Sequence, residues 1–156
     1  RALSAIIAPT TNSYKRLVEG AWAPTTVTWG VDNRTTSMRI LHPSEKYTRL
    51  ETRLRGSGSN PFLAVAAALA SGLYVIKNKL PLNIKPTAGN GYQDKGNGVL
   101  PANLHEAAVA MRNSPIATEL FGADFTGHFT QTRLWEWKQY AKAVTDWELK
   151  RYFEII

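Results

Sequence analysis

The sequence predicts an α+β fold in which antiparallel strands come first and a set of helices follows. Residues 25–54 are rich in Thr, Val and Trp, which strands favour, and their apolar and polar side chains alternate. Residues 61–156 instead contain segments of helical character that are separated by Gly, Pro and Asn. A run of strands followed by a run of helices is typical of the α+β class.

Three strands are expected in the first third of the chain. Apolar and polar side chains alternate in residues 25–31. The Asp-Asn pair that follows indicates a turn, and therefore a hairpin into residues 35–41. Residues 47–54 form the third expected strand. Upstream, residues 1–8 read as the end of a helix and residues 9–20 as a loop.

Capping residues mark the starts of the expected helices. Asn60 caps a helix that starts at Pro61 and runs to about Lys79; it is apolar on almost every side, so we expect it to be buried. Residues 81–101 predict a long exposed loop. Further caps are expected at Asn103, Ser114, Thr126 and Thr145, the last in a capping box with Glu148.

Composition places limits on function. The 156 residues are 44% hydrophobic, which is enough for a core, and carry a net charge of +7 with no cysteine. The absence of cysteine excludes disulfides, thiolate metal sites and a cysteine nucleophile. The longest apolar stretch, residues 62–76, is shorter than the ~20 residues of a bilayer span. We therefore expect no membrane partner and a cytoplasmic protein, and a start at Arg1 indicates a piece of a longer chain.

The segment from Arg49 to Leu54 has the most informative pattern. Side chains alternate in a strand, so Arg49, Glu51 and Arg53 share one face. A carboxylate between two guanidinium groups suits a Mg²⁺-bound phosphate, because the carboxylate binds the hard cation and the guanidiniums bind phosphate oxygens. The alternative is a solvated strand face with ordinary ion pairs.

A second set of cations lies close by in the sequence. Arg34 is at the expected turn, Arg39 is on the next strand and Lys46 precedes the third; Arg16 lies upstream. Convergence of these cations would stabilise phosphoryl transfer. A nucleic-acid patch is the alternative, but the aromatic residues that stack on bases are not interleaved here, so no nucleic-acid partner is expected.

Several motifs together resemble one known family. In order and spacing they resemble the C-terminal part of the glutamine synthetase catalytic domain, and the similarity runs through nearly all of residues 1–156. The motifs are Ala-Pro-Thr-Thr-Asn-Ser-Tyr-Lys-Arg-Leu at 8–17, Asn-Arg-Thr-Thr at 33–36, Arg-Leu-Glu-Thr-Arg at 49–53, Asn-Pro-Phe-Leu at 60–63, Gly72, and Ile-Lys-Asn-Lys at 76–79.

The resemblance implies an ATP-dependent ligase of nitrogen metabolism. Members join glutamate to ammonia or an amine through γ-glutamyl phosphate, with Mg²⁺ or Mn²⁺, and form homo-oligomeric rings (decamers or dodecamers) with active sites between neighbours. The implied contacts are Arg16 and Arg53 to glutamate, Arg34 and Arg39 to the ATP phosphates or the transferred phosphoryl group, with Arg34 as the catalytic residue, Lys46 and Arg49 to the nucleotide, and Glu51 to the metal.

The sequence departs from the family pattern at the amine site. Glutamine synthetases proper carry a Glu, which takes a proton from ammonium, where this chain has Trp22. Tryptophan accepts no proton, although its face binds cations. We therefore predict a larger or partly apolar amine in place of ammonia. The alternative is that Glu19 moves into the site.

The rest of the family's metal ligands lie upstream of this segment. His42, His105 and His128 have no ligand spacing, and one carboxylate does not hold a catalytic pair of metal ions, so we expect residues 1–156 to be inactive alone. A catalytically inactive structural member of the family, like the lens relative lengsin, is the alternative function. Arg55 replaces a frequent Pro without an evident reason.

Overall fold

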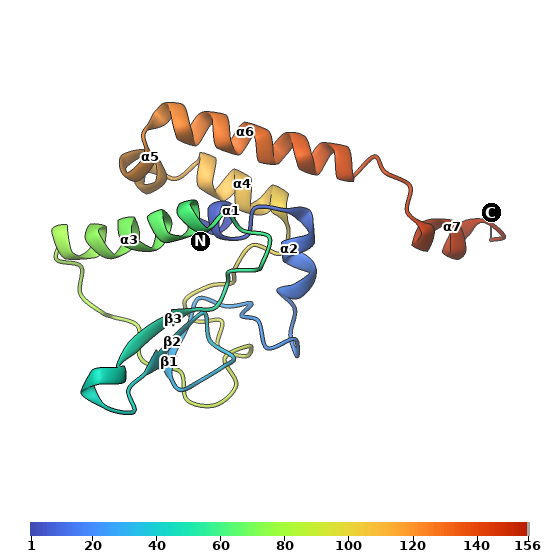
Figure 1. Cartoon of the computed structure of the whole chain (residues 1–156). Helices are drawn as coiled ribbons and strands as arrows, with labels where there is room; N and C mark the ends of the chain where they lie inside the picture. The colour runs from blue at the N-terminus through green and yellow to red at the C-terminus, as the bar shows by residue number, and fades with distance from the viewer. Residues whose placement is uncertain (156) are drawn as a thin grey trace.

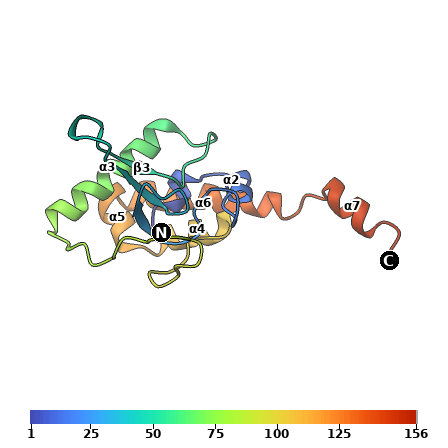
Figure 2. The ribbon, with the colours of Figure 1, turned by 90° about the horizontal axis from the view of Figure 1, so that it is seen from below.

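The computed structural model describes residues 1–155 and has a small sheet on one side of a layer of helices (Figure 1). The predicted α+β class is confirmed. The helices of this layer include α1 (Ser4–Ile7), α2 (Thr11–Arg16), α4 (Leu104–Arg112), α5 (Pro115–Phe121) and α6 (Ala123–Tyr140). In both views α4, α5 and α6 lie together, and α4 packs along α6 (Figure 2).

The sheet has the order β1-β2-β3 and is mixed. β2 (Met38–Leu41) and β3 (Arg49–Thr52) are antiparallel, as expected, with the short 3₁₀ helix η1 (Glu45–Tyr47) between them. β1 (Trp29–Val31) instead runs parallel to β2, so the predicted hairpin is wrong. The chain does not reverse at the Asp-Asn pair. It makes a wider turn over residues 32–37 and re-enters the sheet in its original direction.

The segment predicted as a loop before the sheet contains α2, so that prediction is wrong. Thr10 caps this helix: its Oγ1 accepts a hydrogen bond from the Ser13 amide at 3.2 Å. Six helical residues are too few to display an apolar period, which is why the sequence pattern missed them.

Three of the four predicted caps in the second half are confirmed. Asn103, Ser114 and Thr145 accept hydrogen bonds from backbone amides at the starts of α4, α5 and α7 (Asp146–Tyr152), and Thr145 forms the predicted capping box. Thr126 is not a cap, because α6 begins three residues earlier. Its buried hydroxyl donates to the Ala117 carbonyl instead.

The core lies where α1, α2, α4 and α5 meet. Its largest fully buried apolar side chains are Ile6, Leu104 and Met111. Helix α3 (Pro61–Lys77) joins this core through one edge, with Ala64 and Ala67 as its buried residues and Leu63 partly buried against the core. The prediction that α3 is buried all round is therefore wrong.

The residues after α3 form the predicted long loop, which has no helix or strand of its own over 81–101. It is not exposed throughout, because Gly91, Tyr92 and Leu100 are buried. At the other end of the chain, α7 projects away from the rest of the molecule in both views (Figures 1 and 2). Across residues 1–155, no helix combines the length and the apolar character needed to cross a membrane.

Candidate active site

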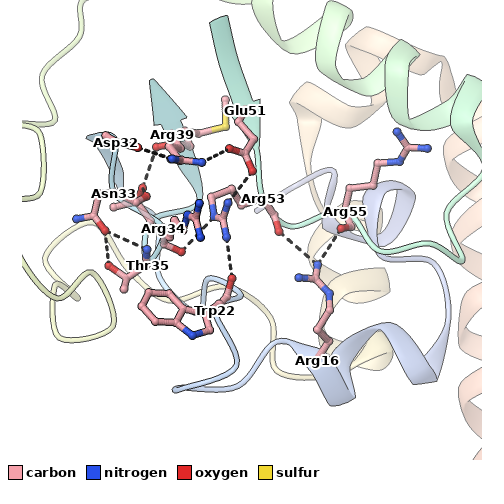
Figure 3. A network of polar contacts seen from close by, with 12 residues as sticks. Arg16, Trp22, Asp32, Asn33, Arg34, Thr35, Arg39, Glu51, Arg53 and Arg55 are labelled. Atoms are coloured by element: carbon pink, nitrogen blue, oxygen red, sulfur yellow. Dashed lines mark hydrogen bonds and ion pairs between the residues drawn. The ribbon is translucent and has the colours of Figure 1, made fainter. Parts of the chain in front are cut away.

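The register of β2 and β3 places two charged side chains opposite each other. Arg39 pairs with Glu51 across the strands, on the same face of the sheet. Arg39 Nη1 donates to Glu51 Oε2 at 2.9 Å, and Arg53 Nη1 donates to Glu51 Oε1 at 2.6 Å (Figure 3). One carboxylate is therefore held between two guanidinium groups, as the alternation in β3 predicted for Glu51 and Arg53.

Arg53 also ties this pair to two other segments. Its Nε donates to the Arg34 carbonyl at 3.1 Å and its Nη2 donates to the Trp22 carbonyl at 2.9 Å (Figure 3). The side chains of Arg39 and Arg53 are each only 13% exposed, and that of Glu51 is 37% exposed. The Arg39–Glu51–Arg53 network is thus mostly shielded from water, which strengthens its electrostatic interactions.

Asp32 is a member of the site that the sequence reasoning missed. Arg39 Nε donates to Asp32 Oδ1 at 3.1 Å, and Arg39 Nη2 contacts the same oxygen. The hydrogen bond from Arg39 lowers the pKa of the Asp32 carboxyl, and Asp32 in turn raises the pKa of Arg39. The only signal in the sequence was the Asp-Asn pair, which was interpreted as a hairpin turn and so gave Asp32 no role in the site.

A cavity of about 590 Å³ lies beside this network. Trp22 and Arg34 line it, together with Thr87–Gly89 of the long loop. Trp22 is 63% exposed and has a left-handed backbone conformation with φ +54°, which is uncommon for a bulky residue. The cavity therefore presents an indole ring, guanidinium groups and backbone from the loop to a ligand.

The remaining predicted cations do not converge on the network. Arg16 Nη2 donates to the carbonyls of Arg53, Leu54 and Arg55 at 3.3, 2.8 and 2.9 Å, so it holds the chain that leaves β3. Arg49 is exposed and donates to the Tyr47 carbonyl at 3.2 Å.

Lys46 lies on η1, with its Nζ 5.5 Å from the centroid of the Tyr47 ring. Among the contacts of residues 1–155, Arg49 does not join Glu51 and Arg53. The expectation that these three side chains act as one trio is therefore wrong for Arg49. The strand alternates as predicted, but Arg49 pairs with Leu41 at the far end of β3 rather than with a charged residue.

The donor set does not form a metal centre by itself. Within residues 1–155 no three His, Cys, Asp or Glu side chains gather in one place. Both oxygens of Glu51 receive a guanidinium hydrogen bond, yet a carboxylate offers about four lone-pair positions, so Glu51 has room for one further bond to a cation. His42 and His105, which have no ligand spacing in the sequence, contact Thr48 and lie 6.3 Å from the Trp137 ring, respectively.

Comparison with known proteins assigns the chain to a family. Residues 1–152 match the family described as glutamine synthetase, catalytic domain. The chain is 50% identical over 152 residues to Type-1 glutamine synthetase 2 of Dictyostelium discoideum, which covers 96% of this chain and 29% of that protein. It is 42% identical over 158 residues to a glutamate–isopropylamine ligase of Pseudomonas sp., which covers all of this chain and 34% of the relative.

A solved structure agrees with these sequence relatives. A structure described as a GmaS/ADP complex superposes with a TM-score of 0.80 at 34% identity, covering 97% of this chain and 36% of the other. The chain thus spans about a third of the length of the relatives that it matches. The family match over 152 residues, the relatives and the shared fold together show that the chain belongs to the glutamine synthetase family.

Proposed function

We propose that this chain forms the C-terminal part of the catalytic domain of an ATP-dependent glutamate–amine ligase. In this reaction the γ-carboxylate of glutamate accepts the γ-phosphoryl group of ATP, and the nitrogen of an amine then displaces phosphate to form the amide. The observation that carries the proposal is the Arg39–Glu51–Arg53 network beside the 590 Å³ cavity. Fixed cations next to a cavity stabilise the charge that a phosphoryl transfer develops.

The proposal assigns a role to each of the cations. Arg34 and Arg39 both line the cavity and would contact the phosphates of ATP, with Arg34 as the catalytic residue. Arg53 would hold a carboxylate of glutamate. The bonds from Arg16 to backbone carbonyls use only Nη2 of its five-donor guanidinium group, which leaves N–H groups for a contact with glutamate.

The other predicted site residues take supporting roles in this proposal. Lys46 and Arg49 are exposed beyond the network and would contact the nucleotide from there. Glu51 would give one ligand to Mg²⁺ or Mn²⁺. Since residues 1–155 supply no complete donor set, the metal site requires ligands from other parts of the enzyme.

Trp22 supports an amine other than ammonia as the acceptor. Its exposed indole lines the cavity at the place where glutamine synthetases proper carry a proton-accepting Glu. An indole face attracts an ammonium group and gives an alkyl substituent an apolar surface. Relatives of this chain include a protein named glutamate–isopropylamine ligase, which is consistent with this choice.

The test is a turnover assay of the full-length enzyme that contains this segment. With ATP, glutamate and Mg²⁺, we expect more γ-glutamyl product and phosphate from alkylamines or polyamines than from ammonia. A preference for ammonia would overturn the amine assignment. ATP binding without turnover of any amine would instead support an inactive, structural member of the family. Mass photometry of the same sample tests the proposed ring of ten or twelve subunits, and cell fractionation tests a cytoplasmic location.

A further inference from the structure

The side chain of Asn33 fastens the long loop to the turn that carries Arg34. Its Nδ2 donates to the carbonyls of Thr87 and Gly89 at 3.1 and 2.8 Å. Its Oδ1 accepts from the amide and the hydroxyl of Thr35 at 2.9 and 2.6 Å. The carboxamide thus uses both donor hydrogens on the loop and its acceptor oxygen on the turn, so no other uncharged side chain of this size replaces it.

The surrounding backbone leaves the fastened loop little freedom. The Thr87 amide donates to the Trp29 carbonyl at 2.8 Å, and the Gly91 amide donates to Thr35 Oγ1 at 2.7 Å. A Cβ atom on Gly91 would lie 2.8 Å from the Thr35 carbonyl oxygen, and one on Gly30 would lie 2.9 Å from the Thr87 carbonyl oxygen. Glycine at both positions lets the loop approach the turn this closely.

The fastened segment is also one wall of the cavity beside Trp22. Thr87, Ala88 and Gly89 face a space that Trp22 and Val31, each 63% exposed, border from other sides. Ala88 and Gly89 are small, so this wall leaves room for a substituent of limited size. Its distance from the indole ring depends on how firmly Asn33 holds the carbonyls of Thr87 and Gly89.

We propose that Asn33 is a specificity-determining positioning residue, which sets the size of the acceptor amine by fixing the Thr87–Gly89 wall. This inference rests on the proposed ligase function, and it assigns the amine's apolar substituent to the space between the indole ring and that wall. Asn33 itself touches no reacting atom in this scheme. Its effect reaches the amine through the backbone of the loop.

The experiment compares Asn33→Asp and Asn33→Ala with the unchanged full-length enzyme. Asp keeps the acceptor for Thr35 but loses both donors, and Ala removes the group without adding charge. Asn78→Asp is the matched control, since the Asn78 amide also donates to a backbone carbonyl, that of Tyr74, but lies on exposed surface at the end of α3. Amide hydrogen exchange is measured at Thr87 and Gly91, and kcat/KM is measured for methylamine, isopropylamine and ATP.

Both Asn33 variants should raise exchange at Thr87 and Gly91 by about tenfold, because the loop opens more often without its two hydrogen bonds. The ratio of kcat/KM for isopropylamine to that for methylamine should rise by about tenfold as the wall yields. KM for ATP should stay within about twofold in Asn33→Asp, which keeps the bonds to Thr35 in the turn that carries Arg34. The control variant should change none of these values.

Unchanged exchange at Thr87 and Gly91 would overturn the fastening role of Asn33. Raised exchange with an unchanged amine ratio would overturn its role in specificity, while leaving the ligase function intact. If the unchanged enzyme forms no γ-glutamyl amide with any amine, the proposed function fails, and the specificity inference fails with it.

Discussion

Replacing Trp22 with Glu would move the enzyme toward ammonia. A carboxylate about 4 Å from an ammonium ion gains about 4 kcal/mol at an effective dielectric constant near 20 and about 1 kcal/mol in bulk water. Because Trp22 is 63% exposed, a value near the lower limit, about 1.5 kcal/mol, applies. Loss of the indole removes a further ~0.5 kcal/mol of cation–π attraction for an alkylammonium group. The backbone cost of φ +54° is shared by Trp and Glu and cancels.

The Coulomb gain of about 1.5 kcal/mol acts on every ammonium group alike, so it predicts that kcat/KM for ammonia rises about tenfold over that of the unchanged enzyme. Loss of the indole raises the ratio of kcat/KM for ammonia to that for isopropylamine about twofold. The assay is steady-state formation of γ-glutamyl product by the full-length enzyme at one pH, with both amines. Trp22→Gln is the control, because it matches Glu in size without charge and should shift the ratio only about twofold through the lost indole. An unchanged kcat/KM for ammonia in the Glu variant, or an equal rise in the Gln variant, would refute the electrostatic reasoning.

Three further predictions concern stability. Glu51→Gln should lower the free energy of unfolding in urea by about 2 kcal/mol, because two guanidinium groups lose their charged acceptor. An unchanged urea midpoint of unfolding would show that the network does not stabilise the fold. Gly91→Ala should cost about 1–3 kcal/mol in the same titration, since its Cβ would meet a carbonyl oxygen at 2.8 Å. Gly96→Ala, whose Cβ would meet its nearest neighbour at 3.7 Å, is the control, and an equal loss there would contradict the steric argument. Thr145→Ala should lower amide protection in α7 by removing a cap worth about 1 kcal/mol. Acid should weaken α7 in the same way, because the backbone hydrogen bond from Thr145 lowers the pKa of Glu148 below its ordinary value of 4.5. The stabilisation that Glu148 provides is therefore present above pH 4.5 and is lost as the pH falls through the lower, folded-state pKa. If amide protection in α7 did not depend on pH across this range, the capping box would not be its source.

Local signals predicted the helices better than the pairing of the strands. Asn103, Ser114 and Thr145 cap helices through bonds within a few residues, so the sequence contains all the information needed. The parallel pairing of β1 and β2 depends on a wide turn that brings residues 29–31 alongside residues 38–40, and a dipeptide does not encode that path. The exposure of α3 could not be predicted from its apolar composition either, because an apolar helix is buried only where other elements cover it.

Alternation along β3 predicted half of the site. It placed Glu51 and Arg53 on one face, and strand register brings Arg39, which was expected to converge with them, opposite Glu51. Arg16 was expected beside them, but its guanidinium lies on backbone carbonyls, a partner that sequence patterns do not indicate. Asn33 was recognised only as part of a motif, because its bonds to the long loop join it to residues more than 50 positions away.

The turn between the two parallel strands has a consequence for how the chain tolerates changes in length. Residues 32–37 carry Asp32, Asn33 and Arg34, and they also fix where β2 begins to pair. An insertion or deletion of one residue that slipped this register would rotate Arg39 to the opposite side of the sheet, away from Glu51. A substitution in this turn therefore changes the contacts of one side chain, whereas a change in its length would separate Arg39 from Glu51 and break the charged network.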